Sequence, residues 1–428
     1  MSPTIARPEH SHFRWTVCAL LFFATTINYV DRQVLSLLAK TLEVQIGWTA
    51  NQYGSITSAF AAAYGIGLLG AGRLLDKFGT RLGFAIAVAV WSAAAMMHAA
   101  ATTAFTFGMA RVLLGFGESA NFPACIKTVA EWFPKRQRGL ATGIFNCGSN
   151  IGAVLTILVV PWMAEKFGWQ SAFLATGALG FVWLAVWLML YKRVDLHPKV
   201  SVEELALIQS DPPDKVESVT WRRVFPKRET WAFAMGKFFT DPVWWFYLFW
   251  LPKYLQDTYH LPLASSNILH DIRLPMLIVY TASDVGSVGG GWLSGGLINR
   301  GWSINAARKT AMLICALCAL PVLYAPYVGN MWVLVAILSL AMAAHQGWSA
   351  NLFTTPSDMF PRVAVGSVVG IGAAMGALGN ALMLKAAGLI VTWTNSYFLL
   401  FMFAGSAYLV ALGIIHLLSP RLEQAKLD

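Results

Sequence analysis

Residues 15–38 read WTVCALLFFATTINYVDRQVLSLL, an apolar stretch whose only charged side chains are Asp31 and Arg32. The stretch is long enough to cross a bilayer as a helix, which takes about 20 residues. An ionised group at that depth costs roughly 2.5–3.5 kcal/mol, so it persists only where a protein or water-filled interior supplies partners. A second apolar stretch carries Arg111 and Glu118. The sequence therefore predicts a membrane protein with charged groups along an internal path.

The composition favours the same class of protein. Of the 428 residues, 57% are hydrophobic and 12% are charged, whereas soluble proteins have about 25% charged residues. The net charge of +10 comes from basic residues in separate loops, so we expect a lipid bilayer as partner and no nucleic acid.

Cys315 and Cys318 have the spacing of half a metal site but no second cluster beside them, so we expect no metal and no cofactor. The first ten residues are polar, and we expect no cleavable signal peptide.

Apolar windows of about 20 residues recur along the whole chain and predict an all-α membrane protein with twelve transmembrane helices. The windows are 15–38, 52–74, 82–101, 103–126, 138–161, 170–191, 231–255, 273–298, 307–327, 330–353, 364–391 and 395–418. They divide the chain into an N-terminal six-helix bundle over 1–191, a polar linker over 192–229 and a C-terminal six-helix bundle over 230–428.

Basic residues gather in alternate loops, after the second, fourth, sixth, eighth and tenth windows. Cytoplasmic loops carry an excess of lysine and arginine, and this bias sets the orientation of a membrane protein. We therefore expect a multi-pass protein whose two termini and central loop are cytoplasmic.

The two halves repeat each other at a constant offset of 227 positions. Phe133-Pro134-Lys135 corresponds to Phe360-Pro361-Arg362, and the glycines that follow keep the same register: Gly139, Gly143 and Gly152 match Gly366, Gly370 and Gly379. A repeat with both copies in one orientation predicts two bundles related by an axis along the membrane normal, with the substrate site between them.

Two motifs resemble the major facilitator superfamily. The stretch Gly72–Arg81, GRLLDKFGTR, is similar to the signature between its second and third helices, and Arg111–Ala120, RVLLGFGESA, is similar to its fourth-helix motif. The resemblance implies that Asp76 and Arg81 belong to a gate that holds the outward-facing state. Gly295–Arg300 is a weaker second-half copy of this motif, at an offset of 223, and has Asn299 in place of the aspartate, so a matching gate there should be weaker.

A narrower resemblance covers nearly the whole chain. Asn28-Tyr29-Val30-Asp31-Arg32, Glu131–Pro134 and Asp241–Phe246 are similar to motifs of the anion:cation symporters, and the last of them to their hexuronate transporter branch. The resemblance implies proton-coupled import of a sugar-acid anion, such as galacturonate or glucuronate, by alternating access across a bacterial inner membrane. It also places a substrate-contacting tyrosine at Tyr64.

The charged residues predict a division of labour. The planar fork of arginine binds a carboxylate through two hydrogen bonds, so Arg32 or Arg111 should hold the anionic substrate. Asp31 and Glu118 should carry protons, because a buried carboxylic acid can exchange a proton near neutral pH. Arg111 and Glu118 are seven residues apart and return to nearly one helix face.

Other polar residues in the windows are further candidates. Tyr29, Asn146, Ser149 and Asn380 are suited to contact the substrate. Lys237 and Asp241 are spaced as an i, i+4 pair, and we expect them either to pair or to take part in binding, with His345 as another interior group. The alternative for each charged residue is a purely structural ion pair, and polar residues also join membrane helices.

Competing functions are an exchanger or exporter of another organic monocarboxylate and, from a different class, a membrane-embedded enzyme. An enzyme would need a catalytic constellation such as Ser/His/Asp or a histidine-rich metal cluster, and the eight histidines show no ligand spacing. We therefore expect a transporter, active as a monomer, and no enzyme.

Overall fold

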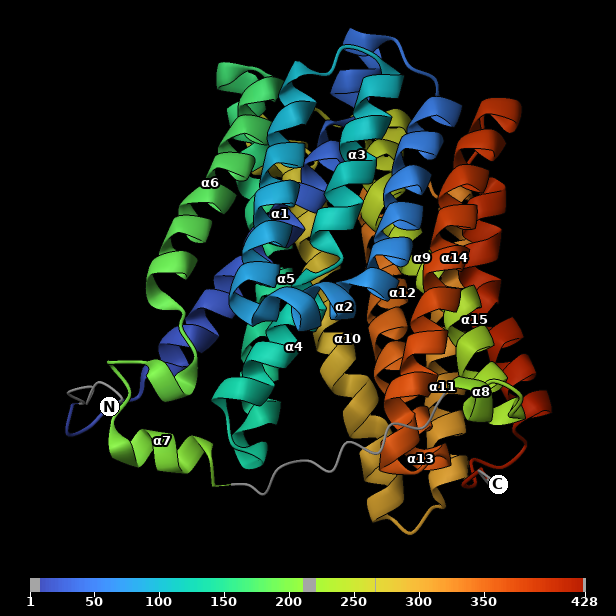
Figure 1. The fold of residues 1–428 in the computed structure, drawn as a ribbon. Coiled ribbons are helices and arrows are strands. Elements are labelled where there is room, and N and C mark those ends of the chain that lie inside the picture. The colour runs from blue at the N-terminus through green and yellow to red at the C-terminus, as the bar shows by residue number, and fades with distance from the viewer. Residues whose placement is uncertain (1–7, 211–220, 266, 426–428) are drawn as a thin grey trace. The chain divides into compact units, whose positions relative to one another are not determined.

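The structure is a computed structural model that describes residues 8–210, 221–265 and 267–425. Within these ranges the chain is helical and contains no β-strand (Figure 1). Residues 211–220 of the predicted linker lie outside the described residues.

Among the described residues, six long helices precede the linker, and six longer helical segments and the short helix α13 follow it. The first set is α1 (Phe13–Ile46), α2 (Ala50–Met97), α3 (Ala104–Glu118), α4 (Asn121–Trp132), α5 (Lys135–Phe167) and α6 (Trp169–Leu190). The linker contains the short helices α7 (Val202–Ile208) and α8 (Trp221–Val224). The second set is α9 (Arg228–Tyr259), α10 (Arg273–Asn299), α11 (Ile304–Ala319) with the 3-10 helix η4 (Leu320–Tyr327), α12 (Met331–Leu352), α13 (Thr355–Met359), α14 (Arg362–Thr394) and α15 (Phe398–Leu418).

All twelve predicted windows lie on helices, and the all-α membrane fold class is confirmed. Eight described helices are long and apolar enough to cross a membrane. One of them, α2, contains both the second and the third window, separated by Gly79 at φ 72°. A positive φ is readily adopted only by glycine, so this residue ends one span and lets the chain enter the next. The remaining windows lie on α3 with α4, on α9 and on α10.

The internal repeat predicted from the sequence is present in the backbone. Helices α5 and α14 begin at positions offset by 227 and both contain 33 residues. Pro134 and Pro361 precede them with the same backbone angles, φ −63° and ψ 151°. Proline fixes φ near this value, so each Phe-Pro-basic motif turns the chain into a long helix in the same way.

The helices form two compact units, which are described separately. Unit 1 comprises Met1–Val34 and Ala63–Lys215, and unit 2 comprises Leu35–Ala62 and Val216–Asp428. The second half of α1 and the start of α2 therefore belong to unit 2, although they lie in the N-terminal half of the sequence. The bundle boundaries predicted at 191 and 230 stay a prediction.

Close backbone contact explains why this segment belongs to unit 2. A Cβ atom at Gly54 in α2 would come within 2.7 Å of the Cα of Gly388 in α14, so the two helices touch where both side chains are missing. The Tyr53 hydroxyl donates a hydrogen bond of 2.6 Å to the carbonyl oxygen of Phe249 in α9. Such small-residue contacts are typical of helix packing in membranes.

Candidate functional site

The centre of unit 1 holds a buried ion pair between α1 and α3. The Arg32 side chain is 4% exposed, and its Nε and Nη2 atoms both lie 2.8 Å from Oε2 of Glu118. Nη2 also donates to Oδ1 of Asn28, one turn earlier in α1. The guanidinium carbon lies 4.8 Å from the ring centroids of both Tyr29 and Tyr64. The cation is thus held by one carboxylate and between two aromatic rings, an arrangement that favours a positive charge.

The neighbouring acid, Asp31, has different surroundings. Its side chain is buried, and its carboxylate has no hydrogen-bond partner of normal geometry among the described residues, although Thr176 lies nearby. Successive residues of a helix point about 100° apart, which explains why Asp31 does not share the partner of Arg32. A buried carboxylate without a hydrogen bond is destabilised when it is charged, so this group is suited to hold a proton.

Arg111 contacts the pair from α3 through the backbone. Its Nη1 atom donates a hydrogen bond of 3.1 Å to the carbonyl oxygen of Arg32. The spacing in the sequence placed Arg111 and Glu118 on one helix face, and both are buried there. The structure, however, joins Glu118 to Arg32 across two helices. Oε1 of Glu118 has no hydrogen-bond partner among the described residues, so the carboxylate keeps one oxygen available.

Asn146 and Ser149 lie on α5, also in unit 1. The Ser149 hydroxyl donates to the carbonyl oxygen of Asn146 at 2.6 Å, so its own donor is used within the helix. A Cβ atom at Gly148 would lie 2.5 Å from the carbonyl oxygen of Phe22 in α1, and one at Gly152 would lie 2.5 Å from that of Thr26. The glycines therefore let α5 contact α1 directly, which brings this face of α5 to the helix that carries Arg32.

The predicted gate residues have partners within unit 1 that the sequence did not indicate. Asp76 forms an ion pair of 2.6 Å with Lys127 of α4, and Arg81 donates to the carbonyl oxygen of Leu188 in α6. Lys127 was not among the predicted site residues, because nothing in its sequence context marks it as a partner of Asp76. The gating role of Asp76 and Arg81 stays a prediction.

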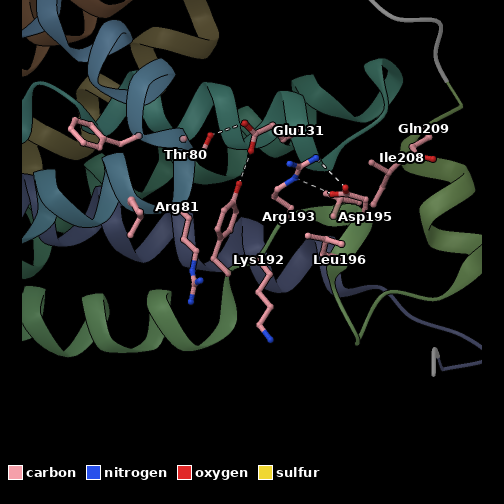
Figure 2. A pocket seen from close by; sticks show the side chains of 14 residues that line it. Thr80, Arg81, Glu131, Lys192, Arg193, Asp195, Leu196, Ile208 and Gln209 are labelled. Carbon is pink, nitrogen blue, oxygen red and sulfur yellow. Dashed lines mark hydrogen bonds and ion pairs between the residues drawn. The ribbon is translucent and has the colours of Figure 1, made fainter. Parts of the chain in front are cut away.

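A cavity of about 930 Å³ lies beside these residues (Figure 2). Glu131 lines the cavity and accepts hydrogen bonds of 2.6 Å from the hydroxyls of Thr80 and Tyr191. Arg193 and Asp195, which also line it, form an exposed ion pair. The basic side chains that line this cavity, Arg81, Lys192 and Arg193, are exposed, so the cavity lacks the buried cation that distinguishes the Arg32 site.

Unit 2 contains the other predicted residues. Lys237 and Asp241 of α9 form an ion pair of 2.7 Å, and the Lys237 ammonium lies 4.2 Å from the ring centroid of Phe353. Nδ1 of His345 in α12 lies 2.8 Å from the Tyr408 hydroxyl in α15, as expected for a hydrogen-bonded interior histidine.

Further polar and aromatic groups of unit 2 lie on α9 and α14. Trp244 stacks on His345 with 5.3 Å between ring centroids, so this indole face is used inside the protein. Asn380 of α14 is 4% exposed, and its Oδ1 atom has no hydrogen-bond partner among the described residues.

One supporting residue of unit 1, Asn28, was not predicted as a site residue. Its i, i+4 spacing from Arg32 is the signal that could have identified it.

Comparison with known proteins identifies the family of the chain. The family model of the Major Facilitator Superfamily matches residues 21–384. The hexuronate transporter of Escherichia coli (strain K12) is 30% identical over 365 residues, which cover 84% of this chain and 83% of that protein. The galacturonate transporter of Dickeya chrysanthemi is 31% identical over 311 residues, covering 71% of this chain and 88% of that protein.

Solved structures with the same fold are more distant in sequence. A bacterial homologue of the human lysosomal transporter Spinster has a TM-score of 0.73 at 17% identity, covering 96% of this chain and 98% of that one. The D-xylose-proton symporter has a TM-score of 0.72 at 15% identity, covering 94% of this chain and 97% of that one. At these identities the likeness establishes the fold alone.

Proposed function

The chain belongs to the major facilitator superfamily, and on that premise we propose that it is a proton-coupled symporter that imports a sugar-acid anion by alternating access. The substrate class follows from relatives that are named as hexuronate and galacturonate transporters. The observation that carries the proposal is the buried Arg32–Glu118 pair between two tyrosine rings.

The arginine supplies the anion site. A guanidinium can bind a carboxylate through two parallel hydrogen bonds, which adds geometric selectivity to charge attraction. In unit 1 this guanidinium forms a buried ion pair with Glu118. A substrate carboxylate would replace Glu118 as the partner of Arg32, while Tyr29 and Tyr64 continue to flank the cation.

The exchange of partners gives a simple form of coupling. A proton that binds to Glu118 removes its charge and weakens its attraction for Arg32, so that the substrate carboxylate can take its place. One proton and one anion enter together, and the charge in the pocket is the same before and after. When the anion leaves, Glu118 releases its proton and pairs with Arg32 again. Asp31 is the second proton carrier, since its buried carboxylate has no hydrogen bond of normal geometry.

The test is uptake into proteoliposomes that contain the purified full-length protein. Labelled galacturonate, glucuronate and neutral hexoses are offered with and without an imposed inward proton gradient. We expect uptake of a sugar acid, acceleration by the gradient, and no uptake of neutral hexoses. Uptake that does not respond to the gradient would contradict symport, and transport of neutral sugars would contradict the anion site.

The proposal includes a location and an orientation. The protein is a multi-pass membrane protein, and we place it as a monomer in a bacterial inner membrane with both termini cytoplasmic, because basic residues concentrate in the loops on that side. A reporter fused to the C-terminus that is active only in the periplasm should remain inactive. An active periplasmic reporter would reverse the orientation.

A further inference from the structure

Unit 2 has its own ion pair on α9, inside the predicted seventh membrane window, and the coupling scheme does not use it. Lys237 and Asp241 lie one turn apart on α9, 2.7 Å from each other, with 7% and 22% of their side chains exposed. Charged residues inside a membrane are expensive and most often functional. This pair is contained within one helix, so its formation or loss does not by itself hold two helices together.

The neighbouring helix is shaped to leave room for the pair. A Cβ atom at Gly376 of α14 would lie 2.3 Å from Oδ2 of Asp241 and 3.4 Å from Cε of Lys237. Any larger residue at this position would displace the carboxylate. One turn further along α14, Asn380 lies on the same face, and its buried Oδ1 atom has no hydrogen-bond partner among the described residues. An acceptor without a partner thus accompanies the pair.

Stability does not explain why the pair is present. Replacing a buried ion pair by well-packed apolar residues is often neutral or stabilising. An ammonium carries three hydrogen-bond donors, and Asp241 is the one acidic partner of Lys237 among the residues that the structure describes. The ring of Phe353 covers another side of the ammonium without accepting a conventional hydrogen bond. Donor and acceptor capacity therefore remains available at this place.

We propose that Lys237 and Asp241 form a hydroxyl-binding subsite that distinguishes sugar acids by the configuration of their hydroxyl groups. This inference rests on the proposed function and extends it to specificity. The ammonium donates to a hydroxyl oxygen, the carboxylate accepts the proton of a hydroxyl, and Asn380 offers a further acceptor. A second carboxylate is a poorer fit, because the pair is neutral overall and Asp241 would repel it.

The expected discrimination follows from the penalty for unsatisfied polar groups. A site that hydrogen-bonds a substrate hydroxyl strongly rejects an analogue whose hydroxyl points elsewhere, because buried polar groups are then left without partners. Galacturonate and glucuronate differ in the configuration of one hydroxyl, so they are suitable probes. We expect the wild-type protein to bind one of them at least about tenfold more tightly than the other.

The experiment measures competition by each epimer against labelled sugar-acid uptake in proteoliposomes. The first variant, Lys237→Met combined with Asp241→Leu, removes both charges and leaves no unpaired charge behind. The second, Gly376→Ala, keeps both charges but displaces the Asp241 carboxylate. The ratio measured is the inhibition constant of the weaker epimer divided by that of the tighter one. Both variants should lower this ratio by about tenfold. Gly366→Ala is the matched control, since a Cβ atom there meets no atom of the described residues within 4 Å, and it should keep the wild-type ratio.

The remaining outcomes separate this subsite from the transport proposal. An unchanged ratio in both folded variants would overturn the subsite, as would a wild-type protein that binds the epimers equally. A shift in the pH dependence of uptake with an unchanged ratio would assign the pair to proton coupling and also overturn it. Absence of sugar-acid uptake by the wild-type protein would instead overturn the proposed function.

Discussion

Units 1 and 2 each bury a basic residue beside an acid, but they arrange the two pairs differently. In unit 1, Arg32 of α1 pairs with Glu118 of α3, so the ion pair joins two helices. In unit 2, Lys237 and Asp241 occupy successive turns of α9. Breaking the first pair removes an ionic contact between two helices, whereas breaking the second removes an ionic contact within one helix, although α14 and Phe353 pack against it. In the two proposals above, the pair between helices couples uptake to protons, and the pair within one helix recognises hydroxyl groups.

The two copies of the internal repeat also differ in the partners of their acidic residue. Glu131, just before the first Phe-Pro motif, accepts hydrogen bonds from Thr80 and Tyr191. Asp358 occupies the equivalent position of the second half and forms an ion pair with Arg308, 3.2 Å from its Nε atom. The repeat has therefore kept the backbone while the partners of its side chains have diverged, so a role found in one unit cannot be transferred to the other.

The largest expected effect is the loss of the cation in unit 1. Arg32→Gln should lower sugar-acid uptake by about 100-fold or more, because it removes the anion partner and leaves Glu118 buried without a cation. Initial uptake rates in proteoliposomes measure the effect. Arg193→Gln, which removes an exposed arginine of the same unit, should leave the rate nearly unchanged. A rate for Arg32→Gln within a few-fold of wild type would refute the anion site.

The second prediction compares Glu118 of unit 1 with Asp241 of unit 2. Glu118→Gln should remove most of the acceleration of uptake by an inward proton gradient, because an amide does not take up and release the proton. Asp241→Asn should keep the acceleration, since its pair lies within one helix. The measurement is the ratio of uptake rates with and without the gradient. If Asp241→Asn lost the acceleration and Glu118→Gln retained it, the assignment of coupling to unit 1 would be reversed.

The helices and the repeat were predictable because their signals are local or periodic. Apolar windows indicate the spans, and the constant offset of 227 identifies α5 and α14 as equivalent helices. The contacts between side chains that lie far apart in the sequence were not predictable in the same way. Arg32 and Glu118 are 86 residues apart in the sequence, and their contact depends on how α1 and α3 are rotated against each other. Motif spacing identified both residues as site candidates but could not show that they pair.

The third prediction concerns the part of the N-terminal half that belongs to unit 2. Asp257 of α9 contacts Lys40 of α1 at 2.7 Å, Lys253 at 2.9 Å and the Tyr397 hydroxyl at 3.0 Å. Lys253 also pairs with Glu43. This network ties the second half of α1 to α9 and α15, so we expect it to stabilise unit 2.

The two lysines of this network differ in burial, which separates their expected effects. Lys253 is 3% exposed, and Lys253→Met should lower the free energy of unfolding by about 2–3 kcal/mol because it leaves two acids without their buried cation. Lys40 is 40% exposed, and Lys40→Met should cost at most about 1 kcal/mol. Thermal unfolding in detergent measures both. Equal losses would contradict the importance of the buried lysine.

The smallest effect is expected where the linker joins the start of α1 in unit 1. Glu204 of α7 accepts hydrogen bonds from the Ser11 hydroxyl, from the backbone N–H groups of Phe13 and Arg14, and from the Arg14 guanidinium. Burial by itself would raise the pKa of Glu204, but these hydrogen bonds outweigh burial and hold the pKa below its usual value of 4.5. The charged carboxylate therefore stabilises the folded state.

The lowered pKa fixes the sign of the pH dependence. Because the unfolded chain takes up the Glu204 proton first, the contribution of this carboxylate is fully present above about pH 4.5 and declines as the pH falls through the folded-state pKa. Glu204→Gln should lower stability by about 1–2 kcal/mol at neutral pH, and its difference from wild type should shrink on acidification. Taking that difference cancels the titration of groups that both proteins share. Glu203→Gln alters an exposed neighbour, 73% accessible, and should neither lower stability nor change its pH dependence. A stability difference for Glu204→Gln that does not change with pH would refute the charged contact.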